Sequence, residues 1–165
     1  METIYNAVTC PVCQMSEVDK SLHYNYRGVH QYFCSNQCLK RFKKHPHLFV
    51  GHPKYGLSVK QKGSEVIKKQ KIQLVNAIDD KAEIRIRSNL QSLMGVKAVQ
   101  FLEQSIFVTY DLIQVSLEDI ENSIVMVIGK LDGSLTEKIK RSFIHYTEEC
   151  EIENLAHLSK DGRCH

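Results

Sequence analysis

Four cysteines near the start of this 165-residue sequence have the spacing of metal ligands. Cys10 and Cys13 form a Cys-x2-Cys pair, and Cys34 and Cys38 form a Cys-x3-Cys pair. A knuckle of the first kind presents two sulfur atoms from one turn, and residues four apart on a helix share a face. Structural zinc sites are closed tetrahedra of such thiolates. The sequence therefore predicts a four-thiolate zinc site, with iron or copper as alternative metals and free thiols or a disulfide as the alternative without metal.

Short elements around the cysteines are expected to position them. Strand patterns at 22–26 and 29–33 flank Arg27-Gly28, a turn in which glycine supplies a positive φ. Ser35 has the residue type of a helix N-cap, and Pro46 must end the helix that follows. This arrangement places Cys34 at the entrance of the helix and Cys38 one turn inside it.

The same segment resembles a known family of small metal-binding modules. The resemblance covers about residues 5–50 and lies in Val12-Cys13-Gln14-Met15, Tyr26-Arg27-Gly28, Tyr32 to Cys38, Phe42 and His45-Pro46. These resemble the YHS/TRASH zinc-finger-like modules, which implies a treble-clef-like domain of the kind found in or beside heavy-metal transporters, metal-responsive regulators and metal sensors. Two departures are Gln14, where glycine is usual, and Cys10, which many YHS modules lack.

The rest of the chain alternates strand and helix patterns. The expected order is a strand at 72–75, a helix at 80–94, strands at 96–101 and 105–110, a helix from Ser116 to Gly129, and a last helix from Ser134 with Leu135, Ile139, Phe143 and Tyr146 as its apolar face. An apolar run at 125–131 is the candidate closing strand. The predicted fold class is α+β, a treble-clef-like zinc module plus a ferredoxin-like split βαβ domain with a C-terminal helix.

Residues 70–131 resemble a heavy-metal-associated domain. The resemblance lies in Leu90-x2-Leu93-Met94-Gly95-Val96, Val108-x-Tyr110-Asp111 and Asp119-Ile120. It implies the ferredoxin-like fold of copper chaperones and of the N-terminal modules of metal-pumping ATPases. The metal-binding CxxC of that family would fall near Asp79 and Ala82, so its thiolates are missing. We expect Asp79 and Asp80 to interact with the helix dipole, with a site for a harder ion as the alternative.

The end of the chain offers a second, weaker candidate metal site. It consists of His145, Glu149, Cys150, Cys164 and His165. His145 and Glu149 are four apart and share a helical face. The alternative is an exposed acidic helix followed by a frayed terminus.

Charge divides the chain into a basic and an acidic part. The net charge of +3 is the sum of +8 over residues 1–78 and −5 over residues 79–165. The expected organisation is a four-cysteine module at 1–53, a basic linker at 54–69, a ferredoxin-like domain at 70–132, and a helix and tail at 133–165. No apolar run reaches the length of a membrane span, and no secretory signal is visible, so we expect a cytoplasmic chain without membrane insertion.

Three classes of function are compatible with these features to different degrees. The leading hypothesis is a non-catalytic protein of heavy-metal handling, with a metal transporter, another metal-handling protein or a second copy of the chain as partner. The second is a nucleic-acid-binding or regulatory module. It would use Lys40, Arg41, Lys43, Lys44, Lys54, Lys60, Lys62, Lys68, Lys69 and Lys71 with Tyr32, Phe33 and Tyr55. An enzyme is not expected, because the sequence has no Ser/His/Asp set, P-loop or dinucleotide-binding fingerprint.

Overall fold

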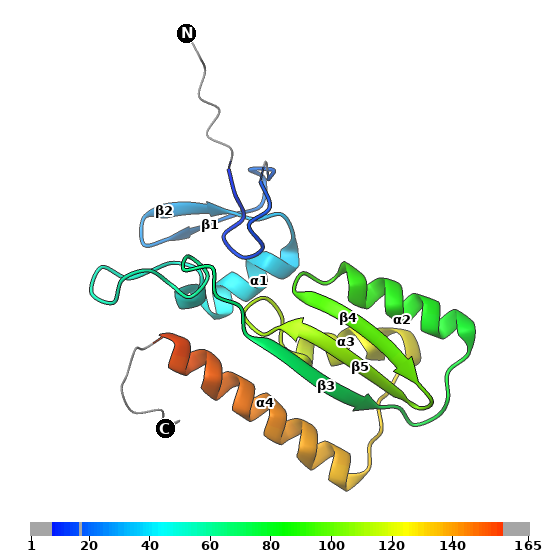
Figure 1. Ribbon diagram of the computed structural model, residues 1–165. Coiled ribbons are helices and arrows are strands. Elements are labelled where there is room, and N and C mark those ends of the chain that lie inside the picture. The colour runs from blue at the N-terminus through cyan, green and yellow to red at the C-terminus, as the bar shows by residue number, and fades with distance from the viewer. Residues whose placement is uncertain (1–7, 17, 157–165) are drawn as a thin grey trace. The chain divides into compact units, whose positions relative to one another are not determined.

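The structure is a computed structural model that describes residues 8–16 and 18–156. Within this part of the chain there are four α-helices and two antiparallel sheets, which confirms the predicted α+β class (Figure 1). The chain divides into two compact units, Met1–Ser64 and Glu65–His165. Each unit has its own buried residues and is described separately.

A β-hairpin opens the described secondary structure of the first unit. Its strands are β1 (His23–Tyr26) and β2 (Val29–Tyr32), as the sequence predicts. Both turn residues have positive φ, 53° at Arg27 and 81° at Gly28. This is the backbone that suits the right-handed twist of a two-residue hairpin. The Gly28 N–H donates to Asn25 Oδ1 at 3.0 Å, which fixes the turn.

Helix α1 (Asn36–Lys44) follows the hairpin and begins as predicted. The Ser35 hydroxyl accepts a hydrogen bond from the Cys38 N–H at 3.3 Å, so Ser35 is the N-cap. The helix ends before the proline that opens a short 3-10 turn, Pro46–Leu48. Cys38 and Phe42, four residues apart, are buried on one face of α1.

The core of the first unit is an aromatic cluster centred on Phe42. The centroid of its ring lies 5.1 Å from that of Phe33, 5.6 Å from Tyr26, 5.9 Å from Phe49 and 6.3 Å from Tyr24. Large aromatic rings give a small unit much buried area from few residues. The cluster therefore joins the hairpin, α1 and the segment after it.

The predicted linker at 54–69 belongs to folded structure instead. The Gln61 Oε1 atom accepts hydrogen bonds from the N–H groups of Gly51 at 2.8 Å and Ser58 at 3.0 Å. These bonds tie its first part to the first unit. Its last three residues lie in strand β3 (Ile67–Gln73), which begins earlier than expected and in which Lys69 and Lys71 are exposed while Lys68 is half-buried.

The second unit contains the following further elements in chain order: α2 (Asp80–Ser92), β4 (Val96–Leu102), β5 (Ser105–Asp111), α3 (Leu117–Ile128) and α4 (Leu135–Ala156). Its three-stranded sheet has the order β3-β5-β4, and β5 is antiparallel to both neighbours. Strands β3 and β4 are therefore parallel and are connected through α2, with β5 between them. This is a split βαβ arrangement.

Alternation along β5 separates a covered face of the sheet from an open one. Phe107 is 37% exposed and points away from the buried side. The buried side contributes to a core formed by Ile86 and Leu90 of α2, Ile106, Val108 and Tyr110 of β5, and Ile120 and Ile124 of α3. On α2, Ile84 is exposed, which the apolar pattern of that helix did not predict.

Helix α3 begins at the predicted capping box. The Ser116 hydroxyl accepts from the Asp119 N–H at 3.2 Å, and the Asp119 carboxylate accepts from the Ser116 N–H at 3.3 Å. Gly129, at φ 82°, follows the last helical residue. Both ends of this helix are therefore confirmed.

The predicted closing strand at 125–131 is wrong. Helix α3 continues through Ile128, and Leu131 is buried outside any strand. The capping box and the glycine stop make a helix of this segment, which leaves too few residues for a strand. After α3, the Asp132 N–H donates a hydrogen bond to the Gln73 carbonyl of β3 at 3.4 Å.

Helix α4 packs on the second unit through polar side chains, along the β3 side of the sheet (Figure 1). Glu148 is buried, and its carboxylate accepts hydrogen bonds from the Tyr110 hydroxyl and, at 2.9 Å, from the Leu117 N–H. Ile152 is buried one turn further on. The predicted apolar face of α4 is therefore not the buried one, because Glu148 turns the opposite side of the helix inward.

We predict that Glu148→Ala lowers the free energy of unfolding of the second unit by about 1–3 kcal/mol, because the Tyr110 hydroxyl and the first N–H of α3 lose a buried acceptor. Urea unfolding followed by circular dichroism measures the change. The matched control is Glu153→Ala, an exposed glutamate of the same helix, which we expect to shift stability by less than about 0.5 kcal/mol. Equal effects of the two variants would contradict the role of Glu148.

Candidate metal centre

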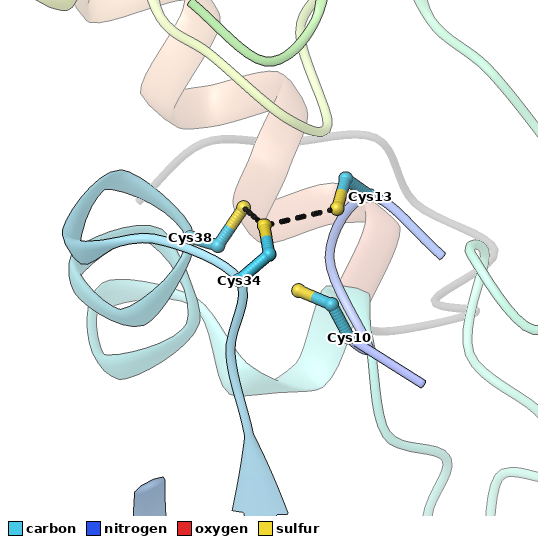
Figure 2. Close-up of side chains that lie close together, drawn as sticks. All are labelled: Cys10, Cys13, Cys34 and Cys38. Carbon is cyan, nitrogen blue, oxygen red and sulfur yellow. Dashed lines mark hydrogen bonds between the residues drawn. The ribbon is translucent and has the colours of Figure 1, made fainter. Parts of the chain in front are cut away.

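The four cysteine sulfur atoms lie within 4.8 Å of one another. The Cys13 and Cys34 sulfurs are 3.3 Å apart, and the Cys34 and Cys38 sulfurs are 3.6 Å apart. Figure 2 shows the side chains of Cys10 and Cys13, from one chain segment, and of Cys34 and Cys38, from another, directed to one point. The structure thus brings together all four residues of the predicted site.

These distances fit a tetrahedral thiolate site. Zinc–sulfur bonds of about 2.3 Å give a tetrahedron with edges of about 3.8 Å. The two measured separations, 3.3 and 3.6 Å, are close to such an edge. Four soft sulfur donors suit zinc, and they also suit Cu(I) and iron. The geometry therefore describes a site that could hold a metal ion, for which zinc is a good candidate.

The first pair of cysteines sits on a tight knuckle. The Cys10 N–H donates to the Met15 carbonyl at 2.9 Å, and the Gln14 N–H donates to the Cys10 carbonyl at 2.9 Å. Closing this turn requires a left-handed backbone at Gln14, with φ 64°. Glycine adopts that conformation without steric cost, whereas most other residues do not. Gln14, which stands where glycine is usual in the YHS/TRASH pattern, is thus the knuckle residue with a strained backbone.

The second pair is fixed by the start of α1. Cys34 follows strand β2, and Cys38 lies in the first turn of the helix. Cys10 and Cys38 are fully buried, while Cys13 and Cys34 are half-buried. One side of the sulfur cluster therefore faces the unit's core, and the other is accessible from outside.

The thiols are held in unequal protonation states. A hydrogen bond from the Cys38 thiol, together with backbone N–H groups of Cys13 and Cys34, lowers the pKa of Cys10 to about 4. Burial raises the pKa of Cys13 to about 12. The hydrogen bond to Cys10, together with burial, also raises the pKa of Cys38. The cluster thus favours one thiolate and resists further ionisation, so a fully ionised set needs a cation to neutralise it.

The structure shows the role of the two aspartates at the start of α2. The Asp79 Oδ1 atom accepts a hydrogen bond from the Ala82 N–H at 2.7 Å, so Asp79 is the N-cap of α2. Asp80 lies in the first turn of the same helix, where a carboxylate interacts favourably with the dipole. The expected helix-start role is confirmed for both aspartates.

The structure describes part of the predicted second site. The imidazole of His145 lies against Glu121 of α3, with 2.9 Å between Nε2 and Oε2. Glu149 and Cys150 are half-buried on α4. Cys164 and His165 lie outside the described residues. Within residues 8–16 and 18–156, three or more metal-ligating side chains come close together in one place, at the four N-terminal cysteines. The tail site therefore stays a prediction.

The basic and aromatic residues suggested for nucleic-acid binding do not all reach the surface. Arg41, Lys60 and Phe33 are buried. Tyr55, at 45% exposure, remains accessible, with the Lys54 ammonium 5.5 Å from its ring centroid. The predicted basic surface is thus smaller than the sequence indicates.

Sequence reasoning missed the residues that support the site from a distance. Phe42 packs behind Cys38 on the same helix face and connects it to four other rings, but its sequence position indicates only an apolar helix residue. Gln14 carried a usable signal, because a knuckle of this length often needs glycine at that place.

No protein-family model, curated protein or solved structure matches this chain. None of the helices in the described part of the chain combines the length and apolar character that a bilayer span requires. Arguments about function therefore depend on the site itself.

We predict that Gln14→Val weakens zinc binding about tenfold, because a β-branched residue in a left-handed conformation adds about 1–2 kcal/mol of strain. Gln14→Gly should bind zinc at least as tightly as the original chain. Competition with a chromogenic chelator measures both affinities. Thr9→Val, an exposed position without positive φ, is the matched control and should leave the affinity unchanged. Tight binding by the Gln14→Val variant would contradict the strain argument.

We also predict that zinc binding at pH 7 releases at least two protons, because Cys13, with a pKa of about 12, and Cys38, with a raised pKa, are protonated without metal. Protons compete with the metal for these sulfurs, so the apparent affinity should rise with pH across the neutral range. Calorimetric titrations in two buffers of different ionisation enthalpy count the protons released. A count below two would show that the thiols are already ionised in the free protein.

Proposed function

We propose that this chain is a non-catalytic metal-binding protein of heavy-metal handling, acting in sensing or trafficking, with a four-thiolate zinc site. The observation that carries the proposal is the convergence of four cysteine sulfurs within 4.8 Å. Two of these sulfurs come from a knuckle and two from a helix start, which supports the likeness to a YHS/TRASH-type treble-clef module. Such sites bind metal tightly, because the donors are brought together by the fold.

The accessible side of the site supports a role in metal handling beyond a purely structural one. Cys13 and Cys34 are half-buried, so a chelator or a partner's thiol can approach the metal from their side. Cys10 and Cys38 are buried and would hold the metal against the core. Exchange through the accessible pair fits a protein that senses or transfers an ion. A reducing compartment such as the cytoplasm keeps such thiols available.

The second unit is proposed as a ferredoxin-like docking frame related to heavy-metal-associated domains. Its strand order β3-β5-β4 and its α2 crossover support this likeness. Asp79 occupies the helix-capping position in place of a thiolate, which supports a role without metal. Residues 65–165, which form the second unit, carry 13 Lys+Arg and 16 Asp+Glu, a net charge of −3, which suits a basic surface on a metal transporter or another metal-handling protein.

Elemental analysis of the purified protein tests the proposal. We expect about one zinc per chain in the original protein under reducing conditions, and loss of that zinc in Cys34→Ser, because three thiolates leave the tetrahedron open. The matched control is Cys150→Ser, which lies on α4 outside the four-sulfur group and should retain the zinc.

The handling role has a separate measurement. Metal loaded at the four-cysteine site should pass to a thiol chelator within minutes, although the affinity is high, since Cys13 and Cys34 are accessible. A protein that carries zinc but exchanges it only on unfolding would have a structural site and no role in trafficking. A protein without metal under reducing conditions would contradict the whole proposal.

A further inference from the structure

Helix α4 exposes large apolar side chains along one side. Leu135 is 73% exposed, Ile139 61%, Phe143 65% and Tyr146 59%. Their spacing of four, four and three residues places them on one side of an α-helix. We call these four residues the α4 stripe. A row of this kind on a 22-residue helix is an interaction surface rather than an ordinary solvated face.

The packed side of α4 is already used within the second unit. Glu148 and Ile152 are buried there, and Glu151 pairs with Lys68 at 2.5 Å between Oε2 and Nζ. The α4 stripe lies on the other side of the helix. Among the described residues, these contacts hold α4 in place without covering the stripe.

Charge is polarised along α4 around the stripe. Lys138 and Lys140 are exposed on either side of Ile139 in the first half of the helix. In the second half, Glu149 is half-buried and Glu153 is exposed, and both continue the side of the stripe. The helix therefore presents a basic end, an apolar middle and an acidic end on one surface.

We propose that the α4 stripe is a homodimer interface in which α4 pairs antiparallel with α4 of a second copy. Antiparallel pairing places the basic end of each helix beside the acidic end of the other. A register with Phe143 opposite the partner's Tyr146 places Lys138 beside the partner's Glu149. Both residues lie on the same flank of the stripe, and the two-fold axis keeps that flank on one side of the pair. Apolar contact and charge complementarity thus coincide in a single two-fold arrangement.

A second copy fits this surface better than an unrelated partner. The pattern is self-complementary only in the antiparallel sense, because a parallel pair would oppose like charges at both ends. The inference uses none of the four cysteines of the proposed zinc site, so it does not depend on the proposed function. The proposed dimer contact consists of α4 alone and includes none of the four cysteines.

Sedimentation equilibrium of the full chain over a range of concentrations tests the proposal. We expect a reversible dimer for the original protein and dissociation for Phe143→Ser combined with Ile139→Ser. Met126→Ser, an 81% exposed methionine on α3, is the matched control and should leave the dimer intact. Circular dichroism confirms that each variant is folded.

Charge reversal tests the antiparallel register. A basic-to-acidic variant, Lys138→Glu with Lys140→Glu, and an acidic-to-basic variant, Glu149→Lys with Glu153→Lys, should each dimerise at least about tenfold more weakly. Mixing the two should restore dimerisation, because each basic end then meets an acidic end. A monomer at all concentrations, a dimer insensitive to the stripe variants, or no recovery on mixing would overturn the proposal.

Discussion

Mutual repulsion among four sulfur atoms is the constraint on which the first unit depends. The chain holds the sulfurs within 4.8 Å, and the pKa of Cys10 is lowered while the pKa values of Cys13 and Cys38 are raised, so a negative charge at Cys10 opposes a second one beside it. A cation removes this conflict, because it neutralises the other thiolates and replaces weak sulfur–sulfur hydrogen bonds with coordinate bonds. The hairpin, the capped start of α1 and the ring cluster around Phe42 then have a fixed point on which to pack. An ion bound at this site would therefore also stabilise the fold of the unit.

The second unit obtains its stability by other means. Its sheet and two covering helices enclose an apolar core, and Asp79 caps the helix that crosses from β3 to β4. The two units thus divide the labour within one chain. The first contains the four-cysteine cluster that could hold a metal ion, and the second has an apolar core of its own.

Local features were the ones that sequence reasoning predicted well. The cysteine spacing, the Arg27-Gly28 turn and the cap at Ser35 each involve neighbours in the chain, so residue types alone identify them. Strand β3 was mistaken in part for a linker because its lysines conceal an alternating pattern that only the strand partner reveals. The orientation of α4 was not predictable, because it is decided by Glu148, whose two hydrogen-bond partners lie 38 and 31 residues away.

The bond from Leu117 to Glu148 has a consequence for how the protein is made. During synthesis, the strands and helices of the sheet leave the ribosome well before the carboxylate that accepts the first N–H of α3. Until α4 has emerged, the Tyr110 hydroxyl and the first N–H of α3 lack this acceptor, so the nascent second unit is less stable. A chain truncated before α4 would keep that lower stability. Helix α4 therefore stabilises a sheet and helices that have already folded.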